Sequence, residues 1–467
     1  LVRGADADAG GRQDARVVRL RFDGVDEASE HQLALHARSL EQAAQSLARA
    51  RSHQAQGSAS GTAELATAQA AMQEALDQAT AAWAAPTQPV AAAAAGTDAL
   101  AGDANRPAAA RAALPPGRLH LTYLVGERRM RIVVQHDNIA RVVTLDADQA
   151  GLARDIALLR RLAQDPGKDP RAQAQRLFRQ LLAPVLPELA RARTLTLSLG
   201  GVLRYLPFAM LHDGRQWLVE RLPLQVAGSA GMDNAAVRAP IAPRARSVAL
   251  FGQSQASGDL PALPFVAREL RAVGAIGTSG RIPTHTYLDA RFTDATLEHA
   301  LQRNSIVHIA SHFVLRPGRD DSSYLVLGDG RQLSLAELAQ ARFRFTGLDL
   351  LTLSACETAV PAGVDASGRE LAGLAWLARE RGARHVLASL WRVSDHSTAA
   401  LMSAFYKALQ RGAGKPEALR EAQLRQIRHT GPERAARARG LRAIDRPASA
   451  PVHGHPFYWA GFTLLGT

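Results

Sequence analysis

Short apolar runs that alternate with amphipathic helical patterns constrain the fold of this chain more than any other feature of the sequence. Helical patterns such as PFVARELRAV (264–273) and FTDATLEHAL (292–301) lie between runs that are compatible with buried β-strands. This alternation favours a mostly parallel α/β sheet with helices on both faces. The strand-like runs are SVALFGQS (247–254), VHIASHF (307–313), LLTLSACETA (350–359) and ARHVLASLW (383–391).

The upstream sequence changes character twice. Residues 1–85 are expected to be mainly helical, because apolar residues recur at helical spacing in 28–85. Residues 86–117 consist largely of Ala, Pro, Gly and Thr, which is typical of a linker. A strand meander is then predicted over 119–145, followed by two helices. Since the first residue is Leu, we expect the chain to be a fragment of a longer protein.

Cys356 is the only cysteine in 467 residues, and it lies where an apolar run ends. A lone thiol cannot form an internal disulfide or a four-cysteine zinc site, so it is either a buried bystander or a nucleophile. His312 also follows a short apolar run. Because ligands bind beyond the carboxyl ends of parallel strands, His312 and Cys356 would meet there if their strands are neighbours.

His308 is the alternative base, but strand geometry argues against it. It lies about 13 Å back along the same strand from His312, at about 3.3 Å per residue. We therefore interpret His308 as a hydrogen-bonded core histidine.

The composition bounds the function. The net charge of +13 comes almost entirely from arginine, since only Lys168, Lys407 and Lys415 are lysine, and heavy alanine use suggests a GC-rich bacterial genome. The densest arginine cluster, within 425–446, contains no aromatic residue for base stacking, so nucleic acid is not an expected partner. We interpret that cluster as a solvated insertion.

Membranes and metals are not expected either. No run approaches 18 apolar residues and no signal-peptide pattern is present, so we expect a soluble protein. The 15 histidines include no HExxH or paired Cys/His spacing, so neither a metal nor a cofactor is expected. A working thiolate needs reducing conditions, which favours the cytoplasm.

Several motifs in a fixed order resemble the CHAT peptidases, caspase-like domains found with tetratricopeptide repeats. They are VHIASHF, LLTLSACETA, GARHVLASLWRVSD (382–395) and HPFYWAGFTLLG (455–466), with LPALPFVARELRAV (260–273) upstream. The similarity runs from about residue 118 to the C-terminus. It implies a caspase-like three-layer α/β/α fold, akin to separase. The parts expected are a helical segment at 1–85, a linker at 86–117, a non-catalytic caspase-like half at 118–242 and a catalytic domain at 243–467.

The resemblance also implies a cysteine endopeptidase with His312 and Cys356 as its dyad. The oxyanion would be held by the backbone N–H groups of Cys356 and Phe313. Many caspase-like enzymes have Gly where Phe313 stands here. Phe keeps the donor but resists a positive φ, so a loop that required this geometry would distort the site.

Four further residues are substrate-binding candidates, each with an ordinary structural alternative. Asp395, in WRVSD (391–395), would select a basic residue before the cut, or cap the helix predicted at 401–409. Ser354 would line the same pocket, or be a plain strand-end hydroxyl. Ser389 to Trp391 would form an edge for an added substrate strand, whereas Trp391 could be a core aromatic.

Two classes of function therefore remain open. The first is an active endopeptidase that cleaves a protein partner and is regulated by an upstream repeat or sensor region or by an activator protein. The second is an inactive CHAT fold that acts as a protein-binding regulatory module. The intact pair of His312 and Cys356 favours the first, and Phe313 favours the second.

Overall fold

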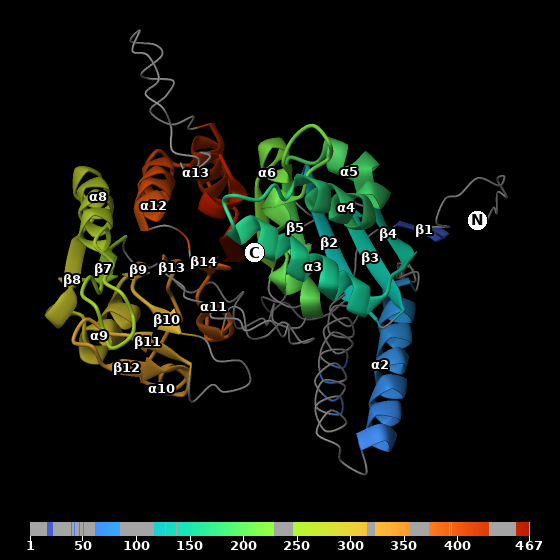
Figure 1. Cartoon of the computed structure of the whole chain (residues 1–467), viewed down its shortest axis with the longest axis horizontal. Helices are drawn as coiled ribbons and strands as arrows, with labels where there is room; N and C mark the ends of the chain where they lie inside the picture. Colours follow the sequence, from blue (N-terminus) through green and yellow to red (C-terminus); the bar gives the residue numbers. More distant parts are fainter. Residues whose placement is uncertain are drawn as a thin grey trace, which may run out of the picture.

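A computed structural model gives the arrangement of the chain (Figure 1). Cys356 lies outside the residues that the structure describes. The described residues are 16–21, 39, 42, 46, 50, 61–84, 116–126, 128–136, 139–227, 246–314, 323–354, 373–391, 393, 395–428 and 454–466.

One sheet of twelve strands runs through both halves of the molecule, in the order β1-β4-β3-β2-β5-β6-β15-β14-β13-β9-β7-β8. The expected meander is confirmed, since β2, β3 and β4 pair antiparallel in chain order. Most other neighbours pair in parallel, as the alternation of strands and helices predicts. The bounds are β1 Arg16–Arg21, β2 Arg118–Val125, β3 Arg129–His136, β4 Ile139–Asp146, β5 Thr194–Ser198, β6 Leu224–Ala227, β7 Val248–Gly252, β8 Thr284–Leu288, β9 Ile306–Ala310, β13 Leu350–Leu353, β14 His385–Ser389 and β15 Phe462–Gly466.

The last strand joins the two halves of the sheet. β15 pairs antiparallel with β14 on one side and parallel with β6 on the other. The boundary expected at residue 242 therefore does not interrupt the sheet. At the far edge, β1 pairs antiparallel with β4, which adds a strand to a region that the sequence predicts to be helical.

Helices cover the sheet where the sequence places them (Figure 1). The two helices predicted after the meander appear as α3 and α4, and the helices predicted at 264–273, 292–301 and 401–409 appear as α8, α9 and α12. The helix bounds are α2 Gly61–Ala84, α3 Gln149–Gln164, α4 Arg171–Leu181, α5 Leu186–Arg191, α6 Leu218–Arg221, α8 Val266–Ser279, α9 Asp294–Arg303, α10 Leu335–Leu338, α11 Gly373–Glu380, α12 Asp395–Gln410 and α13 Lys415–Arg428.

Alternate residues of the central strands enter two separate cores. Leu250 of β7 and Leu350 of β13 pack with α8, α12 and α13, whereas Phe251 and Leu351 pack with α9, α10 and α11. Successive side chains of a strand point to opposite faces, so a strand covered on both faces is apolar throughout. The expected three-layer α/β/α arrangement is therefore confirmed for these strands.

Directly after β9, the chain forms a small antiparallel sheet. It consists of β10 (Phe313–Val314), β11 (Tyr324–Val326) and β12 (Gln332–Ser334), and its last two strands form a hairpin. Gly328, in the turn, lies against the backbone of Asp289, where a Cβ atom would stand 1.9 Å from the Asp289 carbonyl oxygen. This close contact holds the hairpin beside the end of β8.

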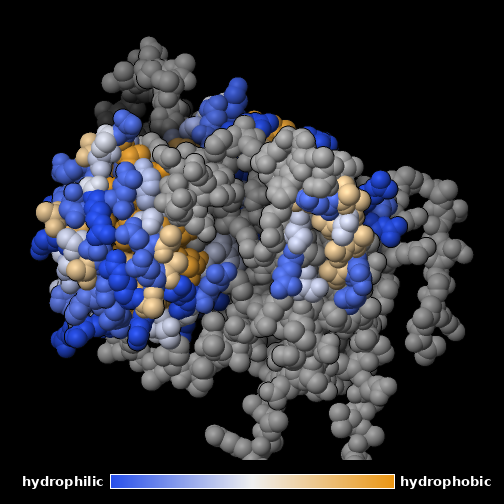
Figure 2. Space-filling view, turned by 90° about the horizontal axis from the view of Figure 1, so that it is seen from below, coloured by the Kyte–Doolittle hydropathy of each residue, from blue (hydrophilic) through white to orange (hydrophobic). Residues whose placement is uncertain are grey.

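The described surface is largely polar. Over the second half, the face in Figure 2 is mostly hydrophilic, with small apolar patches between charged residues. Among the described residues, no helix combines the length and apolar character needed to cross a membrane. Arg425 and Arg428 of the arginine cluster are exposed on α13, and the rest of that cluster lies outside the described residues.

The half-buried side chain of His120 makes the stability of the first half of the sheet depend on pH. The imidazole Nε2 of His120 on β2 lies 2.8 Å from the hydroxyl oxygen of Ser198. Burial, with a smaller effect from the charge of Arg118, lowers the pKa of His120 from 6.5 to about 4. The unfolded chain therefore binds this proton more readily than the folded chain, so the neutral ring stabilises the fold above pH 6.5. That contribution is lost as the pH falls through about 4.

We predict that His120→Asn flattens the acid side of the stability profile. Between pH 6.5 and 4.5 the wild type should lose up to about 1.4 kcal/mol per pH unit more than the variant, since one pKa unit corresponds to that free energy. Thermal unfolding midpoints over this pH range measure the effect. His299→Asn, at an exposed position, should keep the wild-type slope. Equal slopes in the wild type and His120→Asn would contradict the assignment.

Candidate active site

The segments after β7, β9 and β13 meet at one edge of the sheet. β9 and β13 are parallel neighbours, with His308 opposite Thr352 and Ile309 opposite Leu353. The pairing continues past β13, because the Ser354 N–H donates to the Ile309 carbonyl at 3.0 Å. On the other side of β9, the Gln253 N–H donates to the Ala310 carbonyl at 3.0 Å. The strands before His312 and Cys356 are therefore neighbours, which is the condition under which the sequence places the two residues at the same edge.

His312 is buried and oriented by a backbone carbonyl. Its side chain is 2% exposed, and its Nε2 lies 2.8 Å from the carbonyl oxygen of Pro261, in the loop between β7 and α8. A carbonyl oxygen can only accept a hydrogen bond, so Nε2 carries the proton. In the neutral ring this leaves Nδ1 as the basic atom.

Ser354 is the last described residue before Cys356. Two residues of chain span at most about 7 Å, which limits how far Cys356 can lie from Ser354. The hydroxyl of Ser354 is buried and has no hydrogen-bond partner among the described residues, and the same holds for Oε1 of Gln253. Buried polar groups normally have partners. The Ser354 hydroxyl and the Gln253 Oε1 atom are therefore buried polar groups at the carboxyl ends of the strands.

The backbone of Phe313 is extended. It belongs to β10, and the described non-glycine residues with positive φ are Arg281 and Asp289. The Val326 N–H donates to the His312 carbonyl at 2.9 Å. In an antiparallel ladder this means that Phe313 and Leu325, which lie opposite each other, exchange no hydrogen bonds. The N–H of Phe313 consequently points away from β11. The strain anticipated for a phenylalanine at this position does not arise.

Ser389 lies at the end of β14 with its backbone groups directed toward β13. It is paired with Phe462 of β15, and the next residue, Leu390, donates its N–H to the Gly461 carbonyl at 2.8 Å. In an antiparallel ladder this means that Ser389 and Phe462 exchange no hydrogen bonds with each other. Its N–H and C=O therefore point away from β15. The Ser389 hydroxyl donates to the Trp391 carbonyl at 2.5 Å, which folds the segment after β14.

Trp391 is part of the core. Its indole is 1% exposed and donates to the Phe457 carbonyl at 3.2 Å. The side chain of Trp391 therefore lies where a core aromatic would lie, which is one of the two interpretations drawn from the sequence. Asp395 is the first residue of α12, so it lies inside the first helical turn and not before it.

Arg160 links the first half of the molecule to this edge. From α3, its guanidinium donates to the carbonyls of Tyr205 and Leu390, both at 3.0 Å, and lies 5.9 Å from the Trp391 ring centroid. Burial lowers the pKa of Arg160 to about 10, so it remains charged at neutral pH. The buried guanidinium of Arg160 therefore holds in place the carbonyl group of Leu390, the residue after Ser389.

His308 is a buried core residue, as predicted. Its side chain is 0% exposed, with Nδ1 3.3 Å from the Tyr406 hydroxyl. Nε2 lies 2.9 Å from Oε1 of Glu269, although the two are not aligned as a hydrogen bond. The Tyr406 hydroxyl also lies 2.9 Å from that of Thr352, and burial raises the pKa of Tyr406. This network ties α8 and α12 to β9 and β13, away from the carboxyl edge.

Two groups that shape the candidate site were not predicted from the sequence, the Pro261 carbonyl and the Arg160 side chain. The Pro261 carbonyl is a backbone group, so no residue type announces it, although it lies in the LPALPFVARELRAV motif. Arg160 is one of many arginines, and its position in an amphipathic helix gives no sign of its carbonyl partners. Among the residues that the structure describes, no group of three or more His, Cys, Asp or Glu side chains could hold a metal ion.

The CHAT domain family model matches residues 171–467. The chain belongs to the CHAT family. The match covers the regions of both His312 and Cys356, and it begins later than the similarity expected from residue 118. A comparison with curated protein sequences finds no match.

Two solved structures illustrate what this CHAT chain is similar to. The Arg-specific cysteine proteinase gingipain R is 6% identical, with a TM-score of 0.38 over 63% of this chain and 67% of that chain. The Saccharomyces cerevisiae separase–securin complex is 8% identical, with a TM-score of 0.48 over 75% of this chain and 30% of that chain. The aligned region thus spans less than a third of the yeast chain.

We predict that Arg160→Met destabilises the protein by about 2 kcal/mol or more. The substitution keeps an apolar stem but removes two buried hydrogen bonds from a charged donor, each worth about 1.5–3 kcal/mol. Thermal unfolding measures the loss. Arg161→Met is the matched control, because the neighbouring side chain is exposed and should change stability by less than about 0.5 kcal/mol. Equal effects of the two substitutions would refute the role of Arg160.

Proposed function

We propose that this CHAT chain is a cysteine endopeptidase in which Cys356 is the nucleophile and His312 is the general base and acid. The observation that carries the proposal is the orientation of His312. The Nε2–H group of His312 donates to the Pro261 carbonyl. His312 follows β9, and β9 lies beside the strand that leads to Cys356. In an imidazole held in this way, Nδ1 is the atom that would accept and return the proton.

In the proposed reaction, Nδ1 of His312 takes the thiol proton and the Cys356 sulfur attacks the scissile carbonyl carbon. The new C–S bond gives a tetrahedral oxyanion. When the C–N bond breaks, Nδ1 returns the proton to the leaving amine and a thioester remains. Water then attacks the thioester, releasing the acid and restoring the thiol. The Pro261 carbonyl stabilises the imidazolium, since hydrogen bonds to charged donors are stronger.

The oxyanion would be held by the backbone N–H groups of Phe313 and Cys356. For Phe313 the support is its extended backbone and an N–H that points away from β11. Donors fixed before the reaction need no reorganisation as the negative charge develops. The extended backbone of Phe313 therefore supports the active alternative.

The substrate would bind as an added strand along the backbone of Ser389, with Ser354 lining the pocket for the residue before the cut. The support is the unpartnered hydroxyl of Ser354, which follows the β13 residue paired with Ala388 of β14. Trp391, enclosed in the core, would position the strand together with Arg160. Asp395 would select a basic residue before the scissile bond.

The substrate would be a protein, and a region or partner upstream of the catalytic half would regulate cleavage. The continuous sheet supports such control, because β15 and Arg160 connect the two halves directly. A reactive thiolate implies a reducing compartment, for which the cytoplasm is the proposed location.

The test is incubation of the full chain with a peptide library that contains arginine at every position, read by mass spectrometry. We expect cleavage after basic residues, and a loss of about 10³-fold or more in Cys356→Ala and His312→Ala, because these residues act as a unit. Cleavage that survives Cys356→Ala would exclude this nucleophile. Cleavage without a preference for basic residues would remove the role of Asp395. No cleavage by the wild type, even with its upstream region and partners supplied, would favour the binding module.

A further inference from the structure

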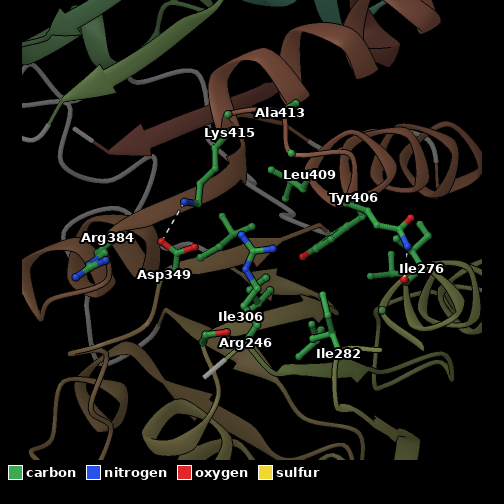
Figure 3. A pocket seen from close by; sticks show the side chains of 18 of the residues that line it. Arg246, Ile276, Ile282, Ile306, Asp349, Arg384, Tyr406, Leu409, Ala413 and Lys415 are labelled. Carbon is green, nitrogen blue, oxygen red and sulfur yellow. Dashed lines mark hydrogen bonds and ion pairs between the residues drawn. The ribbon is translucent and has the colours of Figure 1, made fainter. Parts of the chain in front are cut away.

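The ring of His312 lies at one edge of the sheet, and a cavity of about 380 Å³ opens at the other (Figure 3). The cavity is lined where β7, β9 and β13 begin, and its Lys415 lies 3.0 Å from its Asp349. From Ile306 in the cavity wall to His312, the chain runs about 20 Å, at about 3.3 Å per residue. The groups that orient His312 therefore come from the carboxyl edge, where the loop between β7 and α8 begins.

Asp289, directly after β8, has a backbone conformation that few side chains tolerate. Its φ is +48°, and among the described residues Arg281 is the one other non-glycine residue with a positive φ. Aspartate adopts this left-handed region more readily than most residues, but at a cost in free energy. A strained backbone persists where the surrounding contacts hold it in place. Contacts to both the side chain and the carbonyl of Asp289 hold it here.

The carboxylate of Asp289 binds Ser254, at the start of the loop between β7 and α8. Its Oδ1 accepts hydrogen bonds from the Ser254 N–H at 2.7 Å and from the Ser254 hydroxyl at 3.0 Å, and Oδ2 lies 2.9 Å from the same hydroxyl. Hydrogen bonds to a carboxylate are roughly twice as strong as those between neutral groups. The side chain of Asp289 therefore anchors the start of the loop to the end of β8.

The same loop carries the carbonyl that orients His312. The Leu263 N–H donates to the Ser254 carbonyl at 3.0 Å, which closes the loop on itself, and a bridge within the loop keeps it compact. Pro261 lies between that bridge and Leu263, and its carbonyl accepts from Nε2 of His312 at 2.8 Å. The position of the Pro261 carbonyl therefore depends on where Ser254 is anchored.

The backbone of Asp289 supports His312 from a second direction. The Asp289 carbonyl lies against Gly328, in the turn of the hairpin, where a Cβ atom would stand 1.9 Å from the carbonyl oxygen. Two residues earlier, the Val326 N–H donates to the His312 carbonyl at 2.9 Å. Asp289 therefore contacts both the loop that orients the ring of His312 and the hairpin that pairs with its backbone.

We propose that Asp289 is a positioning residue, which holds the Pro261 carbonyl against Nε2 of His312 through Ser254. The role of the ring in catalysis rests on the proposed function, whereas its orientation does not. Without the carboxylate, the loop would lose its anchor at Ser254, and the Nε2 proton would lose its fixed acceptor. In an enzyme that uses His312 as its base, a misoriented ring weakens proton transfer and leaves substrate binding unchanged.

The test is NMR of the full chain labelled with ¹⁵N-histidine, which measures how fast the Nε2 proton of His312 exchanges with water. His312→Gln identifies the signal. We expect Asp289→Gly to speed this exchange at least tenfold, since glycine keeps the positive φ and lacks the carboxylate. Asp289→Asn keeps an acceptor oxygen and tolerates the backbone conformation, so its exchange rate should stay within about threefold of the wild type. Asp259→Gly, at an exposed position in the same loop, is the matched control and should stay within the same range.

Peptide cleavage gives a second readout, in which Asp289→Gly should lower kcat at least tenfold and change KM less than threefold. Equal proton exchange in the wild type and Asp289→Gly would overturn the inference, as would equally fast exchange in Asp289→Gly and Asp259→Gly. If circular dichroism shows that Asp289→Gly does not fold, Ser254→Ala, which lacks the hydroxyl donor, replaces it. An unchanged exchange rate in Ser254→Ala would then overturn the inference. The expected exchange rates without cleavage by the wild type would refute the proposed function alone.

Discussion

The parallel pairing of β9 with β13 is the constraint on which the candidate site depends. It aligns His308 with Thr352 and carries the chain past Ser354 while it is still hydrogen-bonded to Ile309. The residues that follow the two strands must then emerge at the same edge of the sheet. A shift of register by one residue would exchange the faces of every side chain on a strand. Both faces of β13 are buried in different cores, so such a shift is strongly disfavoured.

Buried polar groups reinforce this arrangement at two places. Inside the sheet, Tyr406 connects His308 to Thr352, which links α12 to both strands. Beside the edge, Arg160 reaches from α3 to the Leu390 carbonyl and connects the upstream half to the segment after β14. Unpaired polar groups at such depth are costly, so each network specifies one arrangement of the elements it joins. The upstream half is therefore a structural part of the site and not a separate appendage.

The sequence predicts the elements better than it predicts their backbone contacts. Apolar runs and helical periodicity place β9, β13 and α12 correctly, because burial on both faces leaves a strong pattern. The same patterns give no sign that β1 pairs with β4, or that β15 closes the sheet between β14 and β6. Such pairings are long-range and depend on the whole topology. The Pro261 carbonyl was hidden for a different reason, since every residue has one and only the fold selects which of them meets His312.

Because the chain has a single cysteine, the reactivity of Cys356 can be measured without interference from another thiol. The most direct test of the account is the rate of alkylation by iodoacetamide from pH 5 to 9, in the wild type and in His312→Ala. We predict a wild-type inflection well below about 8.5, the ordinary pKa of a thiol, and a return toward that value in the variant. Identical pH profiles in the two proteins would contradict the pairing of His312 with Cys356.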